Sequence, residues 1–249
     1  MVKNNFRLKA NNLYIFPLSD LHLGHENCNI DWFTEWEELF ERTPKNKIIY
    51  ILGDMLDMPH SKQDPFSGEG RSVEDCINQL TELLKPYRKY INYYVAGNHE
   101  KRTRQQFNLD ISYIIANELD CPYSYNDFFD TLCINRKPFT VYGKHGTRWS
   151  KSIDLAMRGF KMDLSSIKAD LCMQGHNHYS AFSSDFLRAT DGGVRKYYAF
   201  TGSFLSYKNS YAHDKGTTMT PESFVRLELN RDLKCNCRIY NCDEVITDE

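Results

Sequence analysis

The sequence predicts an α/β protein in which strands and helices alternate along the chain and pack in layers. Three features lead to this prediction: short apolar runs of strand length, segments of helical periodicity between them, and polar residues directly after the runs. The chain has 249 residues, so its length alone allows one domain or two small ones. A chain of this length buries most of its core without disulfide or metal staples.

Five apolar runs are predicted to be buried strands, because they are short and together rich in isoleucine, tyrosine and valine. They cover residues 13–18, 47–52, 91–96, 139–143 and 169–174. Three later strand-like segments have little helical sequence between them, and they cover residues 196–204, 222–229 and 233–240. We regard these three segments as candidates for a second sheet.

The clearest predicted helix covers residues 72–85, where apolar residues recur at helical spacing and form one buried face. Ser72 is placed to cap its N-terminus, with Asp75 three residues later as its partner. Two further helices are predicted over residues 31–42 and 109–119. Strands that alternate with helices in this way indicate a layered α/β fold.

The overall charge is close to balanced, with a formal net charge of −2 and a pI of about 6.5. This argues against a strong global attraction to nucleic acid, although a local basic rim would still bind phosphate. No apolar run approaches the roughly 20 residues of a membrane span, so no membrane partner is expected. Residues 1–12 lack the apolar core of a signal peptide, which predicts a cytoplasmic protein with reduced cysteines.

Three of the eight cysteines lie close together near the end of the sequence, at Cys235, Cys237 and Cys242. One interpretation is a metal-binding knuckle, and the other is a terminal strand on which cysteines alternate with other residues. No fourth ligand stands nearby at the spacing of a zinc finger, which favours the strand interpretation.

Residues of metal-ligand type follow each of the five predicted strands. They are Asp20 and His22, then Asp54 and Asp57, then Asn98, His99 and Glu100, then His145, and finally His176 and His178. An aspartate or histidine at one strand end is ordinarily a turn former or a helix cap. Ligands bind at the carboxyl ends of strands in open α/β sheets, because the loops converge there. Five such ends in one chain therefore favour a metal site, and the mixed nitrogen and oxygen donors suit Mn, Fe, Zn or Co better than calcium.

The ordered series D-x-H, GD-x-x-D, GNHE, H and G-H-x-H resembles the calcineurin-like metallophosphoesterases, and it lies between Asp20 and His178. The resemblance implies a two-layer β-sandwich flanked by helices, and we expect residues 1–249 to form a single metallophosphoesterase domain. The segment 202–216 is also similar to a segment of phage and prokaryotic members of this superfamily.

The resemblance implies a dinuclear site that holds two divalent metal ions. Mn²⁺ is the expected metal, with Fe, Zn, Co, Ni or Mg as alternatives. The first ion would be bound by Asp20, His22 and His178, Asp54 would bridge both ions, and Asn98, His145 and His176 would complete the second. Alternate side chains of an extended segment do not converge on one point, so two ions give each histidine of G-H-x-H its own target.

The resemblance also implies a mechanism in which a water between the two metals loses a proton and attacks phosphorus. His99 would protonate the leaving oxygen, and Asp57 would orient the His99 ring. The alternative role for Asp57 is to cap a helix, since aspartate is a favoured cap.

One departure from the family pattern concerns the phosphate clamp. Protein serine/threonine phosphatases of this superfamily carry Arg-Gly directly after the second aspartate of GD-x-x-D, whereas this chain has Met58 and Pro59. Arg102 and Arg148 are the predicted substrate contacts, with Lys101 and Arg104 as further candidates. The ordinary interpretation of each is a solvated surface charge.

The leading hypothesis is therefore a hydrolase acting on a phosphoester substrate, with a phosphodiester such as a nucleotide or nucleic acid favoured. The alternative within this class is a phosphomonoesterase, and the alternative of another class is a non-catalytic metal-binding scaffold. A purely structural metal site is disfavoured, because such sites are usually closed Cys/His tetrahedra. The tyrosine-rich segment 196–211 has two interpretations, as core or as part of a substrate pocket or subunit contact. The sequence predicts no particular oligomeric state.

Overall fold

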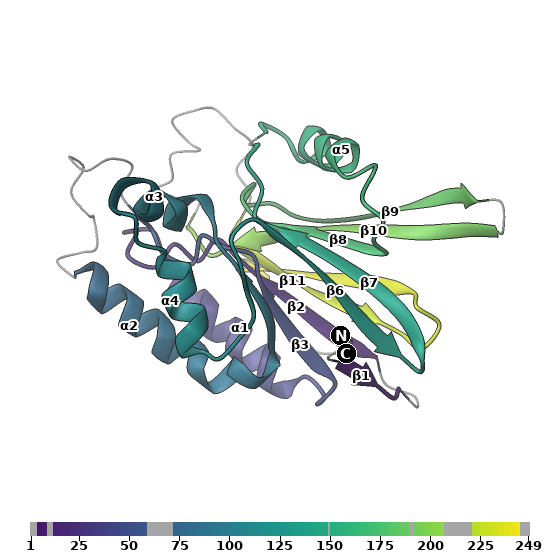
Figure 1. The fold of residues 1–249 in the computed structure, drawn as a ribbon, viewed down its shortest axis with the longest axis horizontal. Coiled ribbons are helices and arrows are strands. Elements are labelled where there is room, and N and C mark those ends of the chain that lie inside the picture. The colour runs from purple at the N-terminus through teal and green to yellow at the C-terminus, as the bar shows by residue number, and fades with distance from the viewer. Residues whose placement is uncertain are drawn as a thin grey trace.

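The computed structural model describes residues 4–8, 12–58, 72–148, 150–189, 192–206 and 221–244. The described chain forms two β-sheets that pack face to face, with helices on the outer face of each sheet (Figure 1). The described helices include none with the length and apolar character that a bilayer crossing requires.

The first sheet has four neighbouring parallel strands at its centre and one edge. These are β2 (Leu13–Leu18), β3 (Lys47–Ile51), β4 (Ile91–Val95) and β5 (Tyr123–Ser124). On the other side of β2 lie the antiparallel strands β11 (Ser223–Leu229) and β12 (Cys235–Asn241).

The second sheet contains a second set of parallel neighbours, β7 (Lys137–Lys144), β8 (Leu171–Gln174) and β10 (Gly192–Ser203). It is extended by β1 (Asn4–Phe6), β6 (Asp127–Ile134) and β9 (Ser180–Ala189). The hairpin of β9 and β10 extends beyond the other strands (Figure 1). At its carboxyl end β10 also pairs with β11, where Gly202 lies opposite Phe224, so the two sheets are joined at that end.

The core between the sheets explains why they pack together. Ile15 and Tyr50 of the first sheet lie in one apolar cluster with Leu132, Val141 and Leu171 of the second. Each of these side chains is almost fully buried. Removal of this apolar area from water favours the face-to-face packing of the two sheets.

The helices cover the outer faces of the sheets. Helices α1 (Ile30–Arg42), α2 (Val73–Leu84) and α4 (Ile111–Glu118) pack on the first sheet, and the 3-10 turn η1 (Lys85–Tyr90) follows α2. Helix α5 (Ile153–Asp163) packs on the opposite side, against the second sheet (Figure 1). Helix α3 (Asn98–Phe107) starts directly after β4.

The predicted α/β sandwich flanked by helices is confirmed, as are the five strands and three helices predicted first. Ser72 and Asp75 form the predicted capping box, in which each residue accepts the backbone N–H of the other, at 3.1 and 2.9 Å. The three later strands do not form a sheet of their own, because β10 joins the second sheet while β11 and β12 extend the first.

The three clustered cysteines lie on and after β12, as the strand interpretation predicts. Cys235 is buried in the core between the sheets, and Cys237 packs partly against the same core. Cys242 packs partly against the other core, beneath the helices, with its Sγ atom 3.1 Å from Oε2 of Glu222. The three thiols therefore do not converge on one point.

Two sequence segments lie only partly within the described residues. The tyrosine-rich segment 196–211 is described to residue 206, where Tyr197 and Tyr198 are buried as core residues. The remainder of that segment, and most of the segment 202–216, lies outside the described residues, as does Pro59.

Candidate metal centre

The register of the strands brings the predicted ligand loops together. In the first sheet Leu18 lies beside Ile51, which lies beside Tyr94, so the loops after β2, β3 and β4 begin at one level. In the second sheet Lys144 and Gln174 are level in the same way. All five strands therefore release their following residues at one end of the sandwich, where parallel strands present ligand sites.

Five of the predicted ligands have left-handed backbone conformations, which are uncommon for residues other than glycine. They are Asp20, His22, Asp54, His176 and His178, with φ between 50° and 70°. Hydrogen bonds between loops hold two of these residues, since the N–H groups of Asp20 and His22 donate to the carbonyls of Gly53 and Asp54, each at 3.0 Å. Such strain clusters at functional sites, where the surrounding structure imposes it.

Asp20, His22 and His178 form the first group of converging side chains. One potential ligand atom from each lies within 4.8 Å of the others. Oδ1 of Asp20 is 3.4 Å from Nε2 of His178 and 3.8 Å from Nε2 of His22. This is the group that the family resemblance assigns to the first metal.

Asp54, His145 and His176 form a second group by the same distance criterion. Nε2 of His145 lies 3.0 Å from Oδ2 of Asp54 and 3.0 Å from Oδ1 of Asn98. The other ring nitrogen of His145 contacts the carbonyl of Leu52 at 2.7 Å. When Nδ1 donates its proton to that carbonyl, Nε2 is left as the ligand atom.

Asp54 lies between the two groups. Its Oδ1 atom accepts the backbone N–H of His99 at 2.8 Å, and its Oδ2 atom faces the imidazoles. Oδ2 is 3.0 Å from His145 and 3.9 Å from Nε2 of His22, which belongs to the first group. A carboxylate in this place is able to contact ions held by either group.

His99 contacts Asp57 at the edge of the site, and it also converges with His22 and Asp54 in a third group by the same distance criterion. Nδ1 of His99 is 2.7 Å from Oδ1 of Asp57, and Nε2 is 3.8 Å from Oδ2 of Asp54. A proton on Nδ1 directed at Asp57 fixes the ring orientation and leaves Nε2 facing the centre. Burial raises the pKa of Asp57, but its contacts with His22 and His99 outweigh this and hold the pKa well below its usual range.

The buried carboxylates attract positive charge into the centre. Burial alone would lower the pKa of His22, but Asp20, Asp57 and Asp54 together raise it to about 10. Burial acts in the same direction on His145, and there Asp54 is the main group that raises the pKa, to about 9. The centre therefore favours a bound cation in place of these protons.

The side chains present fit divalent metal ions. Both ring nitrogens of His22 are buried and have no hydrogen-bond partner among the described residues. An unpaired buried polar group is costly, and a metal ion would satisfy it. The donors are imidazole nitrogens with carboxylate and amide oxygens, a set suited to borderline transition metals.

Comparison with protein families identifies the family to which the chain belongs. Residues 14–188 match the family described as calcineurin-like phosphoesterase. The chain belongs to the calcineurin-like phosphoesterase family. Among curated protein sequences, none matches it.

Solved structures with similar folds include a conserved protein of Streptococcus pneumoniae described as a predicted phosphoesterase, which is 14% identical. That match has a TM-score of 0.43 and covers 94% of this chain and 99% of the other. Vacuolar protein sorting 29 of Cryptosporidium parvum is 14% identical with a TM-score of 0.45, and the match covers 94% and 100% of the two chains. The nuclease MPE of Pseudomonas putida is 12% identical with a TM-score of 0.40, over 86% and 84%.

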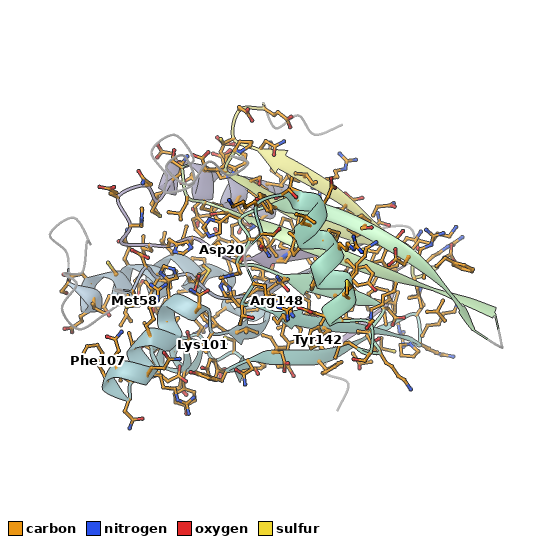
Figure 2. The ribbon with its side chains drawn as sticks, turned by 90° about the horizontal axis from the view of Figure 1, so that it is seen from above. Asp20, Met58, Lys101, Phe107, Tyr142 and Arg148 are labelled. Carbon is orange, nitrogen blue, oxygen red and sulfur yellow. The ribbon has the colours of Figure 1, made fainter. Side chains whose placement is uncertain are left out.

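Arg102 and Arg148, the two predicted substrate contacts, have different surroundings. Nη1 of Arg102 donates to the carbonyl of Met58 at 2.7 Å and lies 3.0 Å from Nδ1 of His99. The side chain of Arg148 is 80% exposed and pairs with Asp163 of α5 at 3.2 Å. Figure 2 shows Asp20 near the middle of the molecule, whereas Phe107 lies at the outer end of α3.

Lys101 and Arg104 lie on another side of α3 from these contacts. Both cations lie over the ring of Tyr125, at 5.0 and 4.4 Å from its centroid. Arg104 also pairs with Asp110 at 3.2 Å. Of the four candidate cations, Arg102 is therefore the one that contacts a predicted catalytic residue.

Two residues of the centre were given no role from the sequence. The hydroxyl of Ser19 contacts both the carboxylate of Asp20 and the hydroxyl of Thr201, which fixes the Asp20 side chain. Glu100 is buried, and its carboxylate accepts hydrogen bonds from the backbone N–H groups of Asp54 and Met55. The position of Glu100 in GNHE is a sequence signal that this residue supports the centre. A serine before D-x-H is too common a residue to give such a signal for Ser19.

Proposed function

We propose that this chain is a phosphoester hydrolase that uses two divalent metal ions, with Mn²⁺ as the expected metal. The observation that carries the proposal is the position of Asp54, whose Oδ2 atom faces imidazoles of both ligand groups. Residues 1–249 would form one domain of this kind.

The proposed ligands follow the two groups. Asp20, His22 and His178 would hold the first ion, Asn98, His145 and His176 the second, and Asp54 both. When bound, two such ions would lower the pKa of a water and offset negative charge on the phosphoryl oxygens. The protein's part is to fix the ligands, and the left-handed loops and their hydrogen bonds serve this purpose.

His99 is proposed to donate a proton from Nε2 to the leaving oxygen. Burial lowers the pKa of His99, and the contact between Nδ1 and Asp57 would hold the ring in place and offset part of that shift in favour of the charged form. His99 is also less buried than His22 and His145, with a side chain 18% exposed, as a residue that meets substrate must be.

The favoured substrate is a phosphodiester, such as a nucleotide or nucleic acid. Met58 takes the place of the arginine that clamps a phosphate in the family's protein phosphatases. The site is therefore less suited to protein phosphatase activity. Arg102 and Arg148 are proposed to contact substrate phosphate, and Arg102 is already held beside His99. A cytoplasmic location is proposed with this activity, and the eight free thiols suit a reducing compartment.

The test uses two chromogenic substrates. The protein is stripped of metal, restored with Mn²⁺, and assayed on bis-p-nitrophenyl phosphate and on p-nitrophenyl phosphate, with D54N run in parallel. Faster cleavage of the diester supports the proposed phosphodiesterase. Faster cleavage of the monoester would replace it with a phosphatase. No cleavage of either substrate by protein that holds its metals would favour a non-catalytic scaffold.

A further inference from the structure

Glu100 is a buried carboxylate beside the metal centre that the proposed mechanism does not use. It is only 2% exposed, although a buried carboxylate is expensive unless hydrogen bonds satisfy it. It lies in the first turn of α3, three residues after the N-cap residue Gly97. Its surroundings therefore need a specific explanation.

Four backbone N–H groups donate to this one carboxylate. Oε1 accepts from Met55 at 2.6 Å and from Leu56 at 3.1 Å. Oε2 accepts from Asp54 at 3.1 Å and from Gly97 at 3.0 Å. Each oxygen thus receives two donors, which matches the acceptor capacity of an ionised carboxylate.

A helix cap explains only one of these four bonds. In a capping box the residue at the third helical position reaches back to the N-cap N–H, as Glu100 does with Gly97. The other three donors belong to consecutive residues, Asp54, Met55 and Leu56, of the loop after β3. That loop is more than 40 residues away in sequence, so Glu100 joins two separate loops.

The two loops are in direct backbone contact at this point. Gly53 has a φ of +86°, and a Cβ atom there would lie 2.3 Å from the backbone nitrogen of Gly97. A Cβ atom on Gly97 would lie 2.0 Å from the backbone nitrogen of Asp54. Both positions therefore require glycine, and the carboxylate of Glu100 closes the contact from behind.

One of the joined loops carries Asp54, and the other ends at Gly97 and leads directly into α3, whose first residues are Asn98 and His99. The N–H of His99 donates to Oδ1 of Asp54 and so turns Oδ2 toward the imidazoles. This bond forms only while the two loops keep their relative position. Glu100 holds the backbone nitrogen of Asp54, which has the left-handed φ of 50°, at that position.

We propose that Glu100 is a positioning residue of the metal centre, which holds the loop of Asp54 against the start of α3 so that one carboxylate reaches both metal sites. The inference rests on the proposed two-metal function and deepens it. Glu100 itself contacts neither metal nor substrate, and it acts through the backbone of the residues that do.

The two acceptor oxygens and the length of Glu100 are both needed for this role. Glutamine would replace one oxygen with an NH₂ group, which would then face two N–H donors and lose both hydrogen bonds. Aspartate would keep both acceptor oxygens but is shorter by one methylene, so it would not reach the loop after β3 and Gly97 at the same time. The two substitutions therefore test the same geometry in different ways.

The experiment compares E100Q and E100D with the wild type and with E118Q, a matched change at an exposed glutamate of α4. Mn²⁺ binding is measured by calorimetry on metal-free protein, folding by circular dichroism, and kcat and KM with bis-p-nitrophenyl phosphate. We expect E100Q to remain folded, to bind one Mn²⁺ about 10- to 100-fold more weakly, and to lose kcat by a similar factor with little change in KM. E100D is expected to lie between E100Q and the wild type.

Wild-type Mn²⁺ affinity and stoichiometry in E100Q would overturn the proposal. So would an E100Q protein that does not fold, or one that loses Mn²⁺ only in proportion to its unfolded fraction, because either result assigns Glu100 to stability alone. A wild-type protein that binds two Mn²⁺ ions but hydrolyses no phosphoester would contradict the proposed function. The calorimetric comparison would still decide the role of Glu100 in that case.

Discussion

A single carboxylate, that of Asp54, lies within 3.9 Å of three imidazoles that come from three separate segments of the chain. They belong to His22, His99 and His145. Desolvation raises the pKa of a buried aspartate, but His145 in particular outweighs it and keeps the pKa of Asp54 well below its usual range. Asp54 therefore stays ionised, as a metal ligand must.

Replacement of Asp54 by asparagine tests its bridging role. D54N keeps the size of the side chain but removes the negative charge that two cations would share, so turnover should fall at least about tenfold. The measurement is kcat per folded protein with Mn²⁺ present, and D232N on an exposed loop is the matched control. A D54N rate close to that of the wild type would rule out the bridging assignment.

His99 and His178 are predicted to fail in different ways when each is replaced by alanine. H99A should keep both ions, since His99 is assigned to proton transfer, and should lose about 10²- to 10⁴-fold in turnover. H178A should lose metal occupancy, because it removes a proposed ligand of the first ion. Metal content per chain, measured by elemental analysis beside kcat, separates the two results. Loss of metal from H99A would make His99 a ligand instead.

At this scale the sequence predicts residue types better than their exact contacts. Asp20, His22 and His178 were assigned to one ion from the family resemblance, and the structure brings those three together. The support from Ser19 and Glu100 depends on which backbone groups two remote loops present to each other. That information lies in the strand register and not in any local sequence pattern.

At the scale of the elements, two buried lysines donate hydrogen bonds to carbonyls at the carboxyl ends of helices. Nζ of Lys47 donates to the carbonyl of Thr43, just after α1, at 3.1 Å. Nζ of Lys196, on β10, donates to the carbonyls of Leu164 and Ile167 after α5, at 2.7 and 2.6 Å. A cation at this end also interacts favourably with the helix dipole.

Replacement of Lys196 by methionine should therefore destabilise the fold. K196M keeps the apolar stem but removes both hydrogen bonds from Nζ, so the carbonyls of Leu164 and Ile167 keep only their backbone donors. This loss should cost about 1–3 kcal/mol in free energy of unfolding. Urea denaturation measures the loss, and K168M at an exposed lysine of the same region is the control. Equal stability of the two variants would contradict this role of Lys196.

The elements that the sequence predicts are those with a strong apolar pattern. Helix α2 has such a pattern with a capping box, and it was predicted to within one residue at each end. Helix α3 was not predicted, because its sequence NHEKRTRQQF buries only Glu100 and Thr103 and shows no apolar face. Tertiary contacts stabilise this helix, among them the hydrogen bonds between Glu100 and the loop that carries Asp54.

At the scale of the whole molecule, the charge balance of the centre predicts how the metal-free protein responds to pH. The pKa of His145 is raised from 6.5 to about 9 in the folded protein, so its protonated form stabilises the fold. That contribution is complete below pH 6.5 and is lost as the pH rises through 9. His22, with a pKa of about 10, acts in the same direction.

Metal-free protein should therefore unfold at a progressively lower urea concentration as the pH rises from 6.5 to 9. Added Mn²⁺ should stabilise it more at the upper end of this range, because its histidine ligands are then neutral and fewer protons must be released. Urea midpoints with and without Mn²⁺ across the range check both expectations. A midpoint that is flat or rises with pH in metal-free protein would contradict the charge assignment.

The architecture was predictable in its class but not in its strand order. Alternation of strands and helices indicates the α/β class, and the family resemblance implies the two-layer sandwich. The antiparallel pairing of β10 and β11, which joins the sheets at Gly202 and Phe224, rests on contacts that no local pattern encodes. The same holds for β2, which pairs with both β3 and the much later β11.

The central claim is that one centre holds two metal ions bridged by Asp54. Electron paramagnetic resonance of the Mn²⁺-loaded protein tests it most directly, because two bridged Mn²⁺ ions are magnetically coupled and isolated ions are not. We expect two Mn²⁺ per chain with a coupled spectrum in the wild type, and loss of that coupling in D54N. A single Mn²⁺ per chain, or the spectrum of isolated ions at full loading, would contradict the account.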